Sequence, residues 1–144
     1  MFKKILVALD NSRTDAAMLS RIGDLAKLHG SELVLLHVSD GWAARNYHRF
    51  HLAESEEMKD DRDYLEKVAS ELRAQGLAVK TQLGLGEPAT GILKTAGEEA
   101  CDLIAMTTHG HRFLKDLLYG NTITQVRHRA EVPVLLMKAA PEDR

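Results

Sequence analysis

The sequence predicts a doubly wound α/β fold, a Rossmann-like five-stranded parallel sheet in the order 3-2-1-4-5 with helices on both faces. Five stretches of strand length alternate with four segments of helical spacing. This alternation favours a parallel sheet, because right-handed crossovers place a helix between successive parallel strands. The 144 residues suffice for one hydrophobic core, so we expect a single domain over residues 1–144.

The composition of the expected strands predicts their order. Four are mostly apolar, namely residues 5–9, 33–38, 103–106 and 132–137, whereas residues 79–83 alternate apolar and polar side chains. Strands buried on both faces form continuous apolar runs, and an alternating strand fits an edge. Pro133 cannot donate a ladder hydrogen bond, which places the last strand at the other edge. The order 3-2-1-4-5 satisfies both conditions.

Each expected helix has apolar residues three or four positions apart, which defines one buried face. In chain order these are Met18, Ile22 and Leu25; Leu65, Val68 and Leu72; Ile92, Ala96 and Ala100; and Ile123, Val126 and Ala130.

Overall charge and cysteine content exclude several classes of function. Lys and Arg number 19 and Asp and Glu 21, so a net charge of -2 disfavours nucleic acid as a partner. The one cysteine, Cys101, cannot form an internal disulfide and fits a reducing cytosol. The apolar run before Asp10 is too short for a signal peptide or a membrane span. We therefore expect a soluble, cytoplasmic protein that does not bind membranes.

The expected sheet reverses its order between the first and fourth strands, and open α/β sheets bind ligands at the carboxyl ends of such strands. Asp10 ends the first strand and Thr107 follows the fourth. Asp10 could hold a metal, accept a hydrogen bond from a base, or help the stretch from Ser12 to Asp15 cap the next helix. Capping is the commonest of these roles.

Two motifs at these strand ends do not support their usual functions. GLGEPA, residues 84–89, resembles a dinucleotide-binding fingerprint but follows the third strand, so we expect a tight turn with Pro88 opening a helix. Asp10, Thr107 and Lys138 match positions of phospho-acceptor receiver domains. The acceptor aspartate after the third strand is missing, because residues 84–86 are Gly, Leu and Gly.

The histidine pairs are weak candidates for a metal site. His109 with His111, and His48 with His51, have no cysteine and no clear third ligand nearby. The second pair lies in the long connection at residues 40–54, for which a surface loop is favoured over a ligand lid.

The stretch HGHRFLKDLLYGN, residues 109–121, suits an anion. Gly110 follows the fourth strand, and Gly120 precedes Asn121 and Thr122, where the last helical pattern begins. Glycines let backbone N–H groups approach a phosphate, and a helix N-terminus favours negative charge. Positive charge would come from His111, Arg112 and Lys115. An ordinary turn with an Asn cap explains the spacing equally well, since the chain has no Walker lysine motif.

The chain resembles the universal stress protein family over nearly its whole length, as a universal stress protein domain. The segments that carry the resemblance are KKILVALDNS, LVLLHVSD, GEPATGIL, CDLIAMTTHGHR and YGNTITQVRHRAEVPVLLMK. ATP-binding members have the pattern G-x-x-G, nine residues, then G-[ST], and Gly110 and Gly120 match its second and third glycines. Thr107 replaces the first glycine and Asn121 the small hydroxyl residue.

The resemblance implies a dimeric stress-response sensor or switch that binds ATP with Mg²⁺ or Mn²⁺ and hydrolyses it slowly or not at all. No residue is expected to be catalytic. The implied nucleotide contacts are Ala8, Leu9, Asp10, Val38, Met106, Thr107, Gly110, His111, Arg112, Gly120, Asn121 and Thr122. A homodimer would pair the apolar edge strand 132–137 with its copy. The alternative is an interaction module of the same fold that binds no nucleotide.

Overall fold

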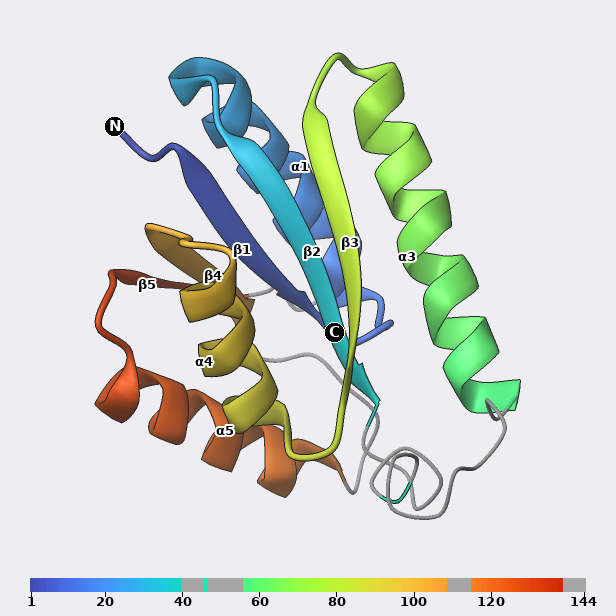
Figure 1. Ribbon diagram of the computed structural model, residues 1–144, viewed down its shortest axis with the longest axis vertical. Coiled ribbons are helices and arrows are strands. Elements are labelled where there is room, and N and C mark those ends of the chain that lie inside the picture. The colour runs from blue at the N-terminus through green and yellow to red at the C-terminus, as the bar shows by residue number, and fades with distance from the viewer. Residues whose placement is uncertain (40–45, 47–55, 109–114, 139–144) are drawn as a thin grey trace.

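The computed structural model describes residues 1–39, 46, 56–108 and 115–138, with the backbone alone for residues 115–120. Five parallel strands form one sheet in the order β3-β2-β1-β4-β5, which confirms the expected fold class and strand order (Figure 1). Within the described residues, no helix is long and apolar enough to cross a lipid bilayer.

The five strands lie where the apolar runs predict them, with small differences at their ends. Their bounds are β1 Lys4–Leu9, β2 Glu32–Ser39, β3 Ala78–Leu85, β4 Leu103–Thr107 and β5 Val134–Met137. The last strand begins two residues later than expected, because the chain joins the ladder only after Pro133.

In the described part of the chain, four helices of several turns cover the sheet, two on each face. They are α1 Thr14–His29, α3 Glu56–Ala74, α4 Pro88–Glu98 and α5 Lys115–Arg129. The side chains of α1 and α3 pack into one apolar cluster with the sheet, and those of α4 and α5 pack into the other. This pairing places α1 and α3 on one face and α4 and α5 on the opposite face.

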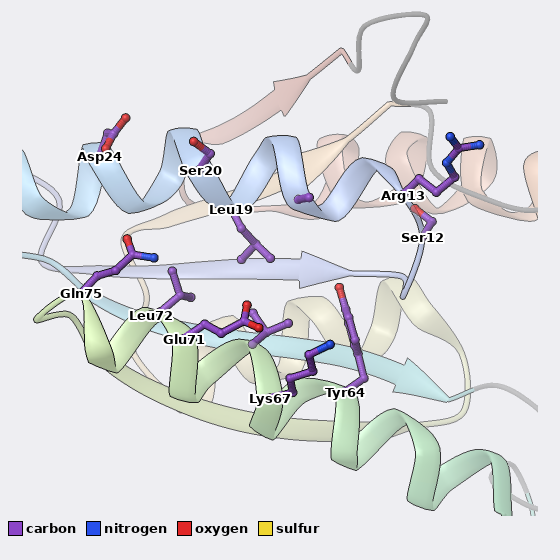
Figure 2. Close-up of a pocket in the computed structure, with 12 residues that line it drawn as sticks. Ser12, Arg13, Leu19, Ser20, Asp24, Tyr64, Lys67, Glu71, Leu72 and Gln75 are labelled. Atoms are coloured by element: carbon purple, nitrogen blue, oxygen red, sulfur yellow. The ribbon is translucent and has the colours of Figure 1, made fainter.

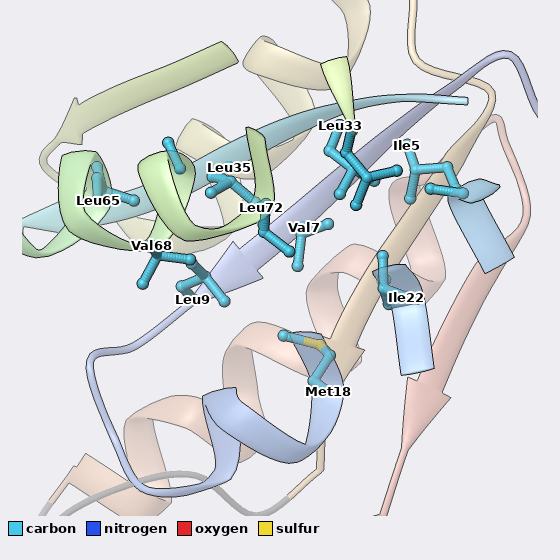
Figure 3. Close-up of a cluster of buried hydrophobic side chains, with 14 of the residues drawn as sticks. Ile5, Val7, Leu9, Met18, Ile22, Leu33, Leu35, Leu65, Val68 and Leu72 are labelled. Carbon is cyan, nitrogen blue, oxygen red and sulfur yellow. The ribbon is translucent and has the colours of Figure 1, made fainter. Parts of the chain in front are cut away.

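The core consists of two apolar layers separated by the central strands. Ile5, Val7 and Leu9 of β1 point toward α1 and α3, and Figure 3 shows Leu9 beside Val68 of α3. The intervening Leu6 and Ala8 point to the other layer, with Ile92 of α4 and Val126 of α5. Successive strand residues alternate between faces, so a strand buried on both sides is apolar throughout.

The turn before α4 agrees with the sequence expectation. Gly86 has a φ of 104°, a left-handed conformation that favours glycine, and Pro88 is the first helical residue. The Glu87 carboxylate accepts hydrogen bonds from the N–H groups of Ala89 at 3.0 Å and Thr90 at 2.7 Å. The GLGEPA segment is therefore a turn and a helix cap.

Two helix boundaries differ from the expectation. Ala100 is exposed and has a φ of 54°, because α4 ends at Glu98 and the chain turns there toward β4. Helix α5 begins at Lys115, so Gly120, Asn121 and Thr122 lie inside it and not at its start. A glycine inside a helix costs about 1 kcal/mol relative to alanine, and the helix nevertheless continues through Gly120.

Candidate functional site

The carboxyl ends of β2, β1 and β4 lie side by side, because β1 has β2 on one side and β4 on the other. The pairing of β1 with β4 ends at Val7 and Ala105, whereas β1 pairs with β2 through Leu9 and His37. Beyond Val7 the backbone edges of β1 and β4 are therefore not joined by the ladder. In open parallel sheets, ligands bind at the carboxyl ends of strands that part in this way, and we call the position between the ends of β1 and β4 the expected crevice.

Four buried oxygen atoms at these strand ends have no hydrogen-bond partner within the described part of the chain. They are Ser39 Oγ at the end of β2, Asp10 Oδ2 after β1, and Thr107 Oγ1 and Thr108 Oγ1 at the end of β4. Buried polar atoms are almost always satisfied in folded proteins, since leaving one unpaired costs about 1 to 3 kcal/mol. These atoms fit a polar ligand that offers hydrogen-bond donors.

Asp10 shapes the turn that follows β1. Its Oδ1 atom accepts a hydrogen bond from the Ser12 N–H at 3.1 Å, and Asn11 between them has a left-handed φ of 58°. The capping role is thus confirmed only in part: Asp10 closes a turn before α1, whereas the residue at the helix boundary, Arg13, makes no side-chain cap. The second carboxylate oxygen of Asp10 remains for other partners.

Asp15, in the first turn of α1, holds this loop from the inside. It is 2% exposed, and its two oxygens accept hydrogen bonds from the N–H groups of Asp10 at 3.3 Å and Asn11 at 2.9 Å. Tyr64 of α3 donates its hydroxyl proton to Asp15 Oδ2 at 2.5 Å. The turn that carries Asp10 is therefore tied to α1 through Asp15 and, through Tyr64, to α3.

The negative charge of Asp10 makes it harder for Asp15 to ionise. Burial raises the pKa of Asp15 to about 7, and the nearby charge of Asp10 adds to that increase. The hydrogen bond from Tyr64 acts in the opposite direction, because it stabilises the ionised carboxylate. Burial and the Asp15 charge also raise the pKa of the Tyr64 hydroxyl, which keeps it protonated as a donor.

His37 links the end of β1 to α3. Its Nδ1 atom lies 2.9 Å from the Leu9 carbonyl oxygen, which can only accept, so Nδ1 carries a proton. Its Nε2 atom lies 3.1 Å from Asp61 Oδ2. Burial alone would lower the pKa of His37, but the hydrogen bond and charge of Asp61 outweigh burial and raise it. The protonated ring thus donates a hydrogen bond to Leu9 and forms an ion pair with Asp61, although the Asp61 Oδ2 atom accepts no well-aligned hydrogen bond within the described residues.

The Val38 side chain packs closely against two glycines. A Cβ atom at Gly91 of α4 would lie 2.9 Å from Val38 Cγ2, and one at Gly84 of β3 would lie 3.1 Å from it. The register of β1 with β2 ends at His37, so the backbone of Val38 continues past the end of β1. Its backbone edge on that side therefore has no partner in β1 and faces the expected crevice.

The structure brings Ala8, Leu9, Asp10, Val38, Met106 and Thr107 together at the carboxyl ends of three neighbouring strands. The side chains of Ala8, Leu9 and Met106 are buried in the two core layers. Because those side chains serve the core, these three residues can reach a ligand only through their backbone.

Of the residues expected to contact phosphate, the structure describes only those in α5. Gly110, His111 and Arg112 lie outside the described residues. Asn121 is exposed and Thr122 is buried, and both lie inside α5 together with the backbone of Gly120. A helix N-terminus directly after Gly120 is therefore wrong for this chain.

The site also contains Asp15, Tyr64, His37 and Asp61, for which the sequence offers only one signal. Asp61 continues the apolar spacing of α3 between Met58 and Leu65, so it is a carboxylate on the buried face of a helix. Such a position indicates a paired charge. Tyr64 has no comparable signal, because its contact with Asp15 spans 49 residues of sequence.

No group of three metal-ligating side chains occurs among the described residues. The pairs His109 with His111 and His48 with His51 lie outside the residues that the structure describes.

A separate cavity of about 430 Å³ lies between α1 and α3. It runs along both helices from Ser12 and Tyr64 to Gln75, with Leu19 and Leu72 among its apolar lining (Figure 2). Tyr64 thus contacts two features at once, the cavity and the Asp15 carboxylate.

Comparison with known proteins gives consistent family matches. The model of the universal stress protein family matches residues 1–138. Universal stress protein MJ0577 of Methanocaldococcus jannaschii is 30% identical, with 96% of each chain aligned. A solved structure of MJ0577 has a TM-score of 0.76 and 31% identity, and the match covers 97% of this chain and 98% of that one.

Two more distant structures share the fold and contain nucleotides. One is a universal stress protein from Archaeoglobus fulgidus in complex with dAMP, at a TM-score of 0.71 and 20% identity, covering 94% of this chain and 98% of that one. The other is a universal stress protein in complex with cAMP, at a TM-score of 0.68 and 17% identity, covering 94% and 96%.

Proposed function

The chain belongs to the universal stress protein family, and we propose that it binds ATP between the carboxyl ends of β2, β1 and β4 as a stress-response sensor or switch. The observation that carries the proposal is the end of the β1–β4 pairing at Val7 and Ala105, next to buried oxygens that have no hydrogen-bond partner among the described residues. Related proteins described in complex with dAMP and cAMP make an adenine nucleotide the most suitable ligand class.

The residues at the strand ends fit the parts of a nucleotide. Asp10 Oδ2 is a buried acceptor suited to a ribose hydroxyl, and the backbone of Val38 borders the crevice where a base would hydrogen-bond. Thr107 Oγ1 is buried and has no partner in the described part of the chain, so this side chain offers a hydroxyl where ATP-binding family members have glycine. Threonine in this place is compatible with ribose binding through that hydroxyl.

The phosphates would lie toward the connection between β4 and α5. Gly110, His111 and Arg112 would supply backbone N–H groups and positive charge, and Gly120, Asn121 and Thr122 would complete the cradle from α5. Mg²⁺ or Mn²⁺ would be carried by the phosphates themselves. We expect slow hydrolysis or none, because the sequence has no Walker lysine motif and no assignable arginine finger.

One observation favours the alternative, an interaction module that binds no nucleotide. Helix α5 begins at Lys115, five residues before Gly120, so its free N–H groups do not follow that glycine. A phosphate at Gly120 would then have to approach the side of a helix or displace its first turn.

We also propose that the protein acts in the cytoplasm as a homodimer. Cys101 is the single cysteine and is buried, as expected in a compartment where disulfides do not form. Strand β5 lies at an edge of the sheet and is apolar, which favours pairing with a second copy.

The test is the nucleotide content of the purified protein. Denaturing the protein and identifying the released small molecules by mass should reveal an adenine nucleotide, and ATP with magnesium should raise the melting temperature. Absence of both effects would contradict the proposal and leave the interaction module as the function.

A substitution at Gly120 locates the phosphates. Gly120→Val adds bulk beside the expected phosphate position and should weaken ATP binding at least tenfold, about 1.4 kcal/mol. Gly120→Ala, which favours the helix, should weaken it less. Unchanged affinity in both variants, measured by calorimetry, would show that the phosphates lie elsewhere.

A further inference from the structure

Two consecutive backbone N–H groups after β1 donate to one carboxylate. Asp15 Oδ1 accepts the Asp10 N–H at 3.3 Å, and Asp15 Oδ2 accepts the Asn11 N–H at 2.9 Å. Asn11 has a φ of 58°, a left-handed conformation that residues other than glycine adopt uncommonly. Asp15 therefore holds the turn in an unusual backbone conformation, and Asp10 is part of that turn.

The Asp15 carboxylate is itself held by Tyr64 of α3. The Tyr64 hydroxyl donates to Asp15 Oδ2 at 2.5 Å, so the carboxylate accepts three hydrogen bonds within the described residues. Figure 2 shows the Tyr64 side chain extending from α3 toward Ser12 at the start of α1. Three donors fix the orientation of the carboxylate, and of these only Tyr64 lies outside the turn.

The hydrogen bond from Tyr64 is important because Asp15 has few other partners. Asp15 is 2% exposed, so water cannot replace a donor that is lost. Without the Tyr64 hydroxyl, Asp15 Oδ2 would keep only the Asn11 N–H as a donor within the described residues. A buried acceptor that loses a donor is destabilised in its original position. The carboxylate, and the turn that it holds, would then sample other conformations.

We propose that Tyr64 is a positioning residue for nucleotide binding, which acts through Asp15 on the turn that carries Asp10 and does not itself contact the nucleotide. The inference rests on the proposed function, in which Asp10 Oδ2 accepts a hydrogen bond from the ribose. A turn that already has its binding conformation need not be ordered when the ligand arrives, which favours affinity. Helix α3 thus contributes to the site, although none of the expected nucleotide contacts lies on it.

The experiment measures ATP affinity in the presence of magnesium, by calorimetry at one pH, for the wild type and Tyr64→Phe. Phenylalanine keeps the ring and removes only the hydroxyl, so ATP binding should weaken about fivefold. The matched control is Thr81→Val, which removes another hydroxyl that donates to a carboxylate of α3, the exposed Glu66, at 2.5 Å. This control should bind ATP like the wild type. Unchanged affinity in Tyr64→Phe, or an equal loss in both variants, overturns the inference.

A double-mutant cycle tests whether Tyr64 acts through Asp15. Asp15→Ala removes the carboxylate, so adding Tyr64→Phe to that variant should change ATP affinity by less than about twofold. The Asp15 charge is absent from both members of this comparison, and its effect on the phosphates therefore cancels. An additional loss as large as in the wild-type background would show that Tyr64 acts by another route.

Amide hydrogen exchange, followed by NMR, tests the turn without any ligand. Exchange of the Asn11 N–H should be at least about threefold faster in Tyr64→Phe than in the wild type, and unchanged in Thr81→Val. Equal exchange rates in all three proteins would overturn the inference even if ATP binds. Absence of ATP binding by the wild type, together with faster exchange in Tyr64→Phe, would contradict the proposed function and leave intact the hold of Tyr64 on the turn.

Discussion

His37 and Asp61 show how a single charged pair can fix the position of a helix against the sheet. Both side chains are largely buried, with exposed fractions of 13% and 8%. The ring donates to the end of β1 through Nδ1 and faces Asp61 of α3 through Nε2. Removing one partner of a buried pair leaves the other charge uncompensated, which costs more than losing a surface pair.

The pair should stabilise the protein mainly at low pH. Asp61 raises the pKa of His37 above its unfolded value, so this contribution is complete below about pH 6.5 and is lost as pH rises through the folded pKa. We expect Asp61→Asn to lower the free energy of unfolding by about 1 to 3 kcal/mol at pH 6 and by less at pH 9. Urea denaturation at both pH values measures the difference.

The exposed pair of Lys94 and Glu98 is the control. Its atoms lie 3.9 Å apart on the surface of α4, so Glu98→Gln should change stability by less than about 0.5 kcal/mol at either pH. An equal loss for Asp61→Asn at pH 6 and pH 9 would show that His37 is not charged in the folded protein.

The sequence predicts single functional residues only where a local pattern points to them. Asp10 is predictable because it ends an apolar strand at a known ligand position. Asp61 is detectable as a charge within an apolar helical pattern. The contact of Tyr64 with Asp15 depends on how α3 packs beside α1, and no spacing within one element contains that information.

Among the elements, α4 approaches β2 closely because glycine is present on both sides of Val38. The Val38 side chain fills the space that a Cβ atom at Gly91 or Gly84 would need. This packing holds the end of β2, and therefore the backbone edge that borders the crevice, in a defined position relative to α4.

A pair of glycines on α4 tests this packing. Gly91→Ala brings a Cβ atom to 2.9 Å from Val38 Cγ2 and should destabilise the protein by about 1 to 3 kcal/mol. Gly97→Ala introduces a methyl group with no atom within 4 Å and should be neutral or stabilise by up to about 1 kcal/mol. Thermal unfolding compares the two variants, and equal effects would contradict the close approach at Val38.

The central residues of each helix and strand can be predicted from the sequence pattern. The exact residues at which an element begins or ends depend on competing local effects. Pro88 marks the start of α4 correctly, because a proline suits the first helical position. Ala100 has the right spacing for a fourth turn, but the turn into β4 ends the helix first. Gly120 suggests a helix start, yet the residues from Lys115 onward are good helix formers and continue through it.

At the scale of the whole molecule, the strand order follows from which strands are apolar on both faces and must therefore be covered by helices on both sides. Continuous apolar runs place β2, β1 and β4 in the middle, and the alternation in β3 and Pro133 before β5 place those strands at the edges. That order brings Ser39, Asp10 and Thr107 to one edge of the sheet, although they are far apart in sequence. The site is a consequence of topology before it depends on any single side chain.

The two edges of the sheet differ in how they are protected. Strand β3 presents polar side chains such as Lys80 and Gln82 among its residues, and charged or polar edges discourage pairing. Strand β5 has the sequence VLLM, and Leu135 in its centre is 37% exposed. An apolar edge of this kind is typical of a strand that pairs with a second copy.

Leu135→Lys tests the proposed dimer. A lysine at the centre of the β5 edge would meet its own copy across a two-fold axis and should convert the dimer to a monomer at micromolar concentration, measured by analytical ultracentrifugation. The matched control is Leu28→Lys on α1, where the side chain is 80% exposed on a helix and not on the edge strand, so this variant should remain dimeric. A protein that stays dimeric with Leu135→Lys does not use this strand for assembly, and a wild type that is monomeric at the same concentration rejects the dimer itself.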